Sequence, residues 1–288
     1  MTNAVKTAGL LGLLSALFIL VGSLFGGSNG VVIAFGFAVV FNFAIYFFSD
    51  RMALAASRAK PIQPGTLPRV EAIVGRLAQI EGMPTPRLYV IESPQPNAFA
   101  TGRSPRHAAV AVTRGILDVM DDRELEGVLA HELAHVKNRD ILIASIAATI
   151  AAALTMLTRM AFWGGMGRRD DNNPVGAILA LISIIVAPLV AMLIQMGISR
   201  AREFQADRSG AQTTGSPLAL ASALQKLEAG TSRVPMEVNP AVSQLFIADP
   251  LKAFGRKGGG RAMASMFASH PPIPERIKRL EEMTMGIR

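Results

Sequence analysis

The stretch His131-Glu132-Leu133-Ala134-His135 decides how this chain is interpreted, because it lies in a run (residues 124–138) whose composition is typical of an α-helix. Positions four apart share one face of a helix, so both imidazoles can point at one metal ion. Glu132 lies about 100° round the helix from His131. From there its carboxylate can reach a metal-bound water without binding the metal. The alternative is a helix with two incidental histidines.

A catalytic zinc site needs a third protein ligand and an open position for water. The chain has no cysteine, so that ligand must be His, Asp or Glu. A more distant histidine, in the spacing His-Glu-x-x-His-x-x-Gly-x-x-His, is excluded because the last two positions hold Asn138 and Ile141. A carboxylate from a later helix is the remaining candidate.

Such a carboxylate occurs in residues 199–208, where Glu203 and Asp207 are four apart and share a helical face. We expect Glu203 to bind the zinc. We expect Asp207 to accept the second N–H of a ligand histidine, which fixes its tautomer and raises its basicity. The alternative is a solvated face of alternating charges. The prediction is therefore one Zn²⁺ per chain, held by His131, His135 and Glu203.

Two apolar runs precede this site. Residues 7–49 carry no charge, and they divide at Gly26-Gly-Ser-Asn-Gly30 into residues 8–25 and 31–48. Each run has about 18 residues, near the length of helix that crosses ~30 Å of hydrocarbon. Neither has the polar face of a soluble amphipathic helix. We expect a transmembrane hairpin, with Asn42 facing a neighbouring helix; a cleaved signal peptide is the alternative for the first run.

Two further apolar runs follow the site. Residues 141–158 and 172–199 are also uncharged, and Arg159 can snorkel to the interface from the end of the first. We interpret both as a second pair of transmembrane helices. The alternative is that they are buried helices that only dip into the membrane.

The other segments are typical of a soluble domain. Residues 67–82 have the periodicity of an amphipathic helix, and residues 87–92 and 107–113 have the pattern of short strands. The metal-site helix is expected to begin near Asp121, which forms a capping box with Glu124. Later helices are expected at 217–230, 240–248 and 274–283, and a flexible basic loop at 255–261. The buried face of the first helix is predicted to hold Val70, Ile73, Val74, Leu77 and Ile80.

The organisation follows from these runs. We expect residues 1–49 to form an N-terminal transmembrane hairpin, 50–140 the first part of the domain that holds the metal site, 141–199 a second transmembrane pair, and 200–288 the second part of that domain, with the third ligand. Nearly all Lys and Arg lie in the two segments of this domain. The positive-inside rule therefore places both in the cytoplasm. Basic residues on the cytoplasmic side of the spans also explain the net charge of +8. The sequence has no basic-aromatic pattern that would indicate a nucleic acid as a partner.

The chain resembles the HtpX-type membrane metalloproteases, which are relatives of the CAAX-prenyl proteases. The resemblance covers nearly the whole chain and includes the N-terminal hairpin, the His-Glu-x-x-His motif, the two further apolar runs and Arg202-Glu203-Phe-x-Ala-Asp207. It also includes Pro96-Asn97-Ala-Phe-Ala-Thr-Gly102 and Ser269-His270-Pro-Pro.

The resemblance implies a mostly α membrane protein, with about four transmembrane helices and an α+β zincin-like metalloprotease domain that contains a small sheet. It implies zinc-dependent endopeptidase activity on protein or peptide substrates. It also implies a bacterial inner membrane as the lipid bilayer that holds the protein, with the protease domain facing the cytoplasm. A role in quality control of misfolded membrane proteins rests on the resemblance alone.

Further residue roles come from the same resemblance. Asn97, Ala98 and Phe99 would lie on an edge strand to which an extended substrate adds by main-chain hydrogen bonds; the alternative is an ordinary turn. His270 and Arg276, six positions apart, would donate to the developing oxyanion. Alternatively, His270 precedes a turn and Arg276 pairs on the next helix.

The chemistry predicted is hydrolysis by a metal-activated water whose proton is taken by Glu132 and passed to the leaving amine. A transporter would place ionisable groups inside its spans, whereas the apolar runs lack them. A non-proteolytic zinc scaffold would close its site with a fourth protein ligand, and Glu132 would then have no purpose. Both remain alternative functions.

Overall fold

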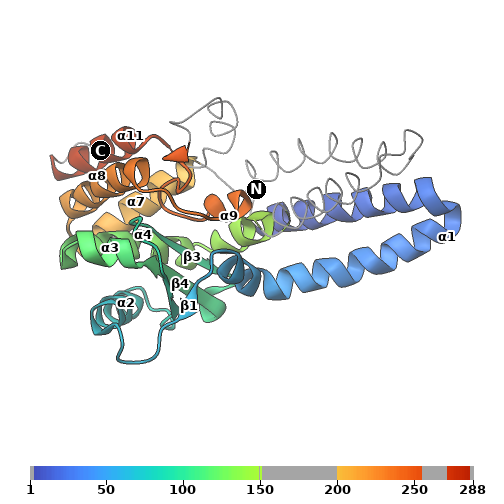
Figure 1. Cartoon of the computed structure of the whole chain (residues 1–288), viewed down its shortest axis with the longest axis horizontal. Helices are drawn as coiled ribbons and strands as arrows, with labels where there is room; N and C mark the ends of the chain where they lie inside the picture. The colour runs from blue at the N-terminus through green and yellow to red at the C-terminus, as the bar shows by residue number, and fades with distance from the viewer. Residues whose placement is uncertain (1–2, 149, 151–199, 255–270, 286–288) are drawn as a thin grey trace.

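A computed structural model of the chain describes residues 3–148, 150, 200–254 and 271–285. A long helical arm, α1 (Asn3–Ala56), projects from a body in which helices pack on a small sheet (Figure 1). The arm bends back on itself at Gly27, where φ is 53° and ψ is −136°. Glycine is the residue that adopts a positive φ at little cost. The predicted break between the two apolar runs therefore falls at this residue.

The two halves of α1 lie side by side. Asn42 donates from Nδ2 to Ser15 Oγ at 2.7 Å and to the Leu11 carbonyl at 3.3 Å. The prediction that Asn42 faces another helix is confirmed. These bonds satisfy the amide nitrogen of Asn42, and such side-chain contacts hold neighbouring helices together in a membrane.

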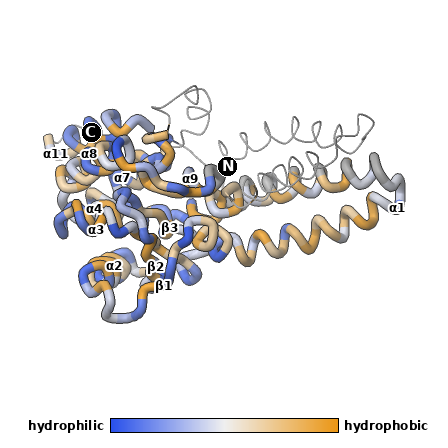
Figure 2. Tube along the Cα trace, viewed as in Figure 1, coloured by the Kyte–Doolittle hydropathy of each residue, from blue (hydrophilic) through white to orange (hydrophobic). Residues whose placement is uncertain are grey.

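One helix among the described residues is long and apolar enough to cross a membrane: the second half of the arm, Gly26–Ala56, with 31 residues. The first half carries a shorter apolar stretch, Thr7–Leu20. Many large apolar side chains of the arm are exposed, among them Val32 at 71% and Ile33 at 72%, and Figure 2 shows the arm as mostly hydrophobic. The predicted second pair of spans in residues 141–199 lies almost entirely outside the described residues, apart from the helical residues 141–148.

The hairpin does not end at residue 49. Its second helix continues to Ala56 and packs its last turns on the body. Ala53 and Leu54 are buried there, and Asp50 forms a 2.6 Å ion pair with Arg87. Asp50 is accommodated in the helix because it has a partner on β2.

The sheet has four strands in the order β1-β2-β4-β3. They are β1 (Lys60–Pro61), β2 (Arg87–Ile91), β3 (Ala98–Gly102) and β4 (Ala108–Thr113). β2 and β4 are parallel, and the other two pairs are antiparallel. The strands predicted at 87–92 and 107–113 are confirmed, and β3 lies at an edge of the sheet.

Both faces of the sheet are covered at β3 and β4, and every residue of these two strands is buried. Ala98, Ala100 and the even-numbered residues of β4 pack against α2, α4 and α8. Phe99 points the other way, towards the end of α1 and residues 236–246. This alternation is the period of two that any strand imposes on its side chains.

The helices of the body are mostly those expected. They are α2 (Pro68–Ile80), α3 (Arg114–Val119), α4 (Asp122–Lys137), α7 (Arg200–Thr214), α8 (Pro217–Arg233), α9 (Pro240–Ser243) and α11 (Ile273–Thr284). A short 3₁₀ turn, Pro105–His107, precedes β4.

Two expectations about these helices were wrong. Ile80, predicted on the buried face of α2, is 58% exposed because the helix ends at that residue. The helix predicted over residues 240–248 stops at Ser243. Beyond it, the backbone of Ile247 and Ala248 bonds to Ala98 and Asn97 instead of continuing a helix. The predicted loop at 255–261 lies outside the described residues.

Candidate metal centre

The helix α4 presents the His-Glu-x-x-His motif. It begins with the predicted capping box, in which Glu124 N–H donates to Asp121 Oδ1 at 2.9 Å and Asp121 N–H donates to Glu124 Oε2 at 3.0 Å. Such a box satisfies two of the unpaired N–H groups at a helix start. His131 is fully buried, and the ring centroids of His131 and His135 lie 4.8 Å apart.

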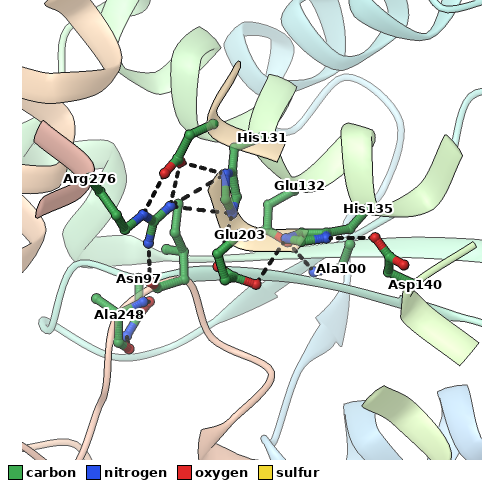
Figure 3. A network of polar contacts seen from close by, with 11 residues as sticks. Asn97, Ala100, His131, Glu132, His135, Asp140, Glu203, Ala248 and Arg276 are labelled. Carbon is green, nitrogen blue, oxygen red and sulfur yellow. Dashed lines mark hydrogen bonds and ion pairs between the residues drawn. The ribbon is translucent and has the colours of Figure 1, made fainter. Parts of the chain in front are cut away.

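The third candidate ligand comes from α7, which packs closely against α4. Glu203 places its carboxylate 3.7 Å from Nε2 of His131 and 3.4 Å from Nε2 of His135. One ligand atom from each of the three lies within 4.8 Å of the others, and Figure 3 shows the three side chains converging. Two imidazole nitrogens and one carboxylate oxygen are the donor set of a catalytic zinc site with an open position. The structure therefore brings all three predicted ligands together.

The two histidines differ in their surroundings, which shift their pKa values in opposite directions. Burial is the largest influence on His131 and lowers its pKa to about 4, so the ring is neutral and can offer a lone pair. Burial also acts to lower the pKa of His135, but the nearby carboxylates of Glu203 and Asp140 outweigh it and raise that pKa. A metal that enters the site must therefore displace a proton from His135.

Asp207 lies behind His131, as predicted. His131 Nδ1 is 2.9 Å from Asp207 Oδ1, so the Nε2 atom is left to face the other ligands. Burial alone would raise the pKa of Asp207, but the adjacent Arg276 guanidinium outweighs it and holds the carboxyl ionised. A second-layer carboxylate of this kind orients a metal-binding histidine.

Arg276, for which the resemblance implies an oxyanion donor, lies beside Asp207 in the structure. It is fully buried and donates from Nε and Nη2 to Asp207 at 2.8 and 2.6 Å, and from Nη1 to the Ile247 carbonyl at 3.2 Å. Nη2 also lies 3.4 Å from Nδ1 of His131. These contacts fix Asp207, and Nη2 also lies 3.5 Å from Nε2 of His131, the nitrogen that faces the other ligands. The other predicted donor, His270, lies outside the described residues.

Glu132 is buried beside the ligands without being one of them. Its Oε2 accepts the Ala100 N–H at 2.8 Å. Burial, helped by the negative charge of Glu203, raises the pKa of Glu132 to about 8. A carboxylate with a pKa near neutrality can both take a proton and return it.

The predicted substrate-binding stretch is occupied by the chain itself. Asn97 donates from Nδ2 to the Ala248 carbonyl at 2.8 Å and accepts the Ala248 N–H at 3.3 Å. The Ile247 N–H donates to the Ala98 carbonyl at 3.0 Å, and Phe99 is fully buried edge-on to Phe246. The structure thus places these residues at the edge of the sheet but shields them with residues 246–248, a segment that sequence reasoning missed.

Close packing of α7 on α4 is possible because of Gly210. A Cβ at this position would lie 2.9 Å from the His131 main-chain nitrogen and 3.2 Å from the Ala130 carbonyl carbon. We expect Gly210→Ala to separate the two helices, to lower the free energy of unfolding by about 1–3 kcal/mol, and to weaken metal binding because Glu203 moves with α7.

Thermal unfolding and zinc titration of the metal-free protein measure both effects of Gly210→Ala. The matched control is Gly75→Ala in α2, where a Cβ meets nothing within 4 Å and alanine favours the helix. Equal stability of the Gly210→Ala variant and the wild type would contradict the packing argument.

A comparison with known protein families identifies the family to which a chain with this site belongs. A family model described as Peptidase family M48 matches residues 64–284, which include the three candidate ligands and Glu132. The chain belongs to peptidase family M48. It is therefore a metallopeptidase, and the three candidate ligands lie within the residues that the family model matches.

Full-length relatives agree. This M48 peptidase is 48% identical over 287 residues to a protein named "Protease HtpX homolog" from Persephonella marina, covering 98% of this chain and 97% of the relative. It is 49% identical over 284 residues to a protein of the same name from Desulfatibacillum aliphaticivorans, covering 97% and 89%. The resemblance to HtpX-type proteases is confirmed.

A solved structure shares the fold. The crystal structure of S. mikatae Ste24p superposes with a TM-score of 0.50 at 20% identity. The match covers 96% of this M48 peptidase but only 65% of the Ste24p chain. At this identity the likeness concerns the fold alone.

Proposed function

We propose that this chain is a membrane-anchored zinc endopeptidase that hydrolyses peptide bonds with a metal-activated water. The observation that carries the proposal is the convergence of His131, His135 and Glu203 beside a buried Glu132. Nitrogen and carboxylate donors in this number suit one Zn²⁺ per chain with a position left for water. A closed structural site would need a fourth protein ligand, and a fourth is not among the grouped donors of the described residues.

When bound, zinc supplies Lewis acidity to the scissile carbonyl and lowers the pKa of its water. Glu132 would take the proton of the attacking water on its carboxylate as the water oxygen adds to the carbonyl carbon. The same proton then passes to the leaving amine as the carbon–nitrogen bond breaks. Ala100 N–H holds Oε2 of Glu132, so the carboxylate is oriented before the substrate arrives.

The substrate is proposed to be an extended peptide that pairs with the edge of β3 by main-chain hydrogen bonds. Ala98 and Phe99 belong to this strand, and Asn97 directly precedes it. For a peptide to reach the Asn97 amide and the Ala98 carbonyl, residues 246–248 must move aside, since their backbone holds both groups. Pairing through main-chain atoms would allow many sequences to be cut.

The biological setting is also a proposal. The exposed apolar arm supports anchorage in a bilayer, and the basic protease segments support a cytoplasmic orientation at a bacterial inner membrane. Misfolded membrane proteins are the proposed substrates, in a quality-control role, because an arm in the bilayer would hold the active site close to them.

Removal of the metal tests this function. Detergent-purified protein is expected to cleave a denatured membrane protein, to lose that activity in a zinc chelator, and to regain it when Zn²⁺ but not Mg²⁺ is returned, because a nitrogen-rich site disfavours Mg²⁺. Peptide products are followed by mass spectrometry and zinc by elemental analysis. Cleavage that continues after the zinc content has fallen to zero would exclude the proposal.

A further inference from the structure

His135, the second candidate ligand, has a carboxylate behind it that neither the motif nor the family match assigns. Its Nδ1 lies 3.4 Å from Oδ2 of Asp140, while its Nε2 faces Glu203 at 3.4 Å (Figure 3). The two ring nitrogens therefore have different partners. The atom on the far side of the ring from the ligand cluster is the one that meets Asp140.

The same arrangement occurs behind His131. There the order is imidazole, Asp207, then Arg276, with 2.9 Å from Nδ1 to the carboxylate and 2.6 Å from the carboxylate to the guanidinium. Behind His135 the order is imidazole, Asp140, then Arg202, whose Nη1 lies 3.5 Å from Oδ1 of Asp140. Each histidine is thus followed by an acid and then an arginine, although the second set lies at longer distances.

The end of α4 explains why Asp140 reaches His135. Arg139 has a φ of 58°, a left-handed conformation that a residue other than glycine rarely adopts. The Asp140 N–H then donates to the His135 carbonyl at 3.0 Å, and the Arg139 N–H to the Val136 carbonyl at 3.1 Å. This pair of bonds is the Schellman motif. It brings Asp140 back over the last turn of the helix, next to His135.

We propose that Asp140 is a positioning residue, whose carboxylate accepts the Nδ1–H of His135 and so directs Nε2 to the zinc, while Arg202 anchors the carboxylate. This inference rests on the proposed zinc site. Arg202 immediately precedes Glu203 on α7. Glu203 would therefore bind the metal directly, while its neighbour Arg202 would act on the metal site through Asp140. Carboxylates in this position typically change metal affinity or activity by 10–100-fold when they are replaced.

A structural role is the competing explanation for Asp140. Its carbonyl accepts the Ala144 N–H at 3.4 Å and so begins the helical residues 141–148. An Asp at such a position can stabilise a helix start through its side chain. That role would change stability, but it would leave the geometry around the metal unaltered.

Zinc affinity of the metal-free protein separates these two roles. Asp140→Asn is expected to bind zinc roughly 10–100-fold more weakly than the wild type in competition with a chromophoric chelator, and to shift the visible absorption of the Co²⁺-substituted protein. Asp122→Asn is the matched control, since Asp122 lies in the first turn of α4 and pairs with Arg69 in solvent. Its affinity and spectrum are expected to equal those of the wild type.

The possible results separate a failure of the positioning role from a failure of the proposed function. Wild-type affinity and an unchanged Co²⁺ spectrum in Asp140→Asn would overturn the positioning role, even if the variant were less stable. If Asp140→Asn does not fold, the Arg202→Gln variant is used instead, because it keeps the Asp140 carboxylate and removes the guanidinium that anchors it. An unchanged zinc affinity and an unchanged Co²⁺ spectrum in Arg202→Gln would also overturn the proposal. A wild type that binds no zinc would instead refute the proposed function.

Discussion

The Glu132→Gln variant is expected to retain zinc at one equivalent per chain and to lose about 10²–10⁴-fold in kcat. Glutamine has the same shape, and its amide oxygen can still accept the Ala100 N–H that Glu132 accepts at 2.8 Å. It cannot take a proton from water, however. Because Glu132 is not one of the grouped metal donors, the metal site should be unaffected by the change.

Peptide cleavage and elemental analysis on the same preparation measure the two halves of this expectation. Glu126→Gln is a suitable control, since Glu126 lies on the same helix and forms an ion pair with the exposed Arg76, a kind of contact that contributes little. Proteolysis at the wild-type rate by a zinc-loaded Glu132→Gln protein would remove Glu132 from the chemistry.

The parts of this site that sequence could predict are those governed by local rules. Helical spacing alone places His131 and His135 on one face, and the spacing of Asp121 and Glu124 marks where the helix begins. Both follow from the geometry of a single helix. The convergence with Glu203 required one more idea, which was the need of a metal for a third donor.

Other parts depend on how distant segments meet. Asp207 and Arg276 are 69 positions apart, and Asn97 and Ala248 are 151 apart. Nothing in residues 246–248 distinguishes them from an ordinary helix end, so their place against β3 could not be predicted. For the same reason the ion pair between Arg276 and Asp207 could not be predicted; the oxyanion role of Arg276 came from the family resemblance and stays a prediction.

Asp140 is an intermediate case, because a local signal was present. It follows His135 by five positions, just beyond Asn138, the residue that caps the end of α4. A helix that ends in the left-handed conformation returns the next residue towards its last turn. Arg139, however, is not the residue that usually marks such an ending, and the signal was therefore weak.

Replacement of Glu203 is expected to abolish metal binding rather than weaken it slightly. The Glu203→Ala variant should lose more than ~10²-fold in zinc affinity, the upper range for residues that only support a ligand, and lose proteolysis with it. Glu203 supplies the negative charge that faces both Nε2 atoms, at 3.7 and 3.4 Å. With alanine in its place, two imidazoles would remain of the three grouped donors.

A graded series identifies Glu203 as the ligand rather than as a packing residue. Glu203→Asp keeps the carboxylate but draws it back by one methylene, so we expect it to retain part of the zinc affinity. The zinc affinity of Asp207→Asn should fall roughly 10–100-fold, the range typical of a residue that supports a ligand. Glu228→Ala, which removes an acid that pairs with Lys252 on the surface, should bind as the wild type does. The affinities should therefore fall in the order Glu228→Ala, Asp207→Asn, Glu203→Ala, because only the last removes a donor from the metal. Full zinc occupancy in Glu203→Ala, measured by elemental analysis after dialysis, would exclude Glu203 and with it the three-ligand site.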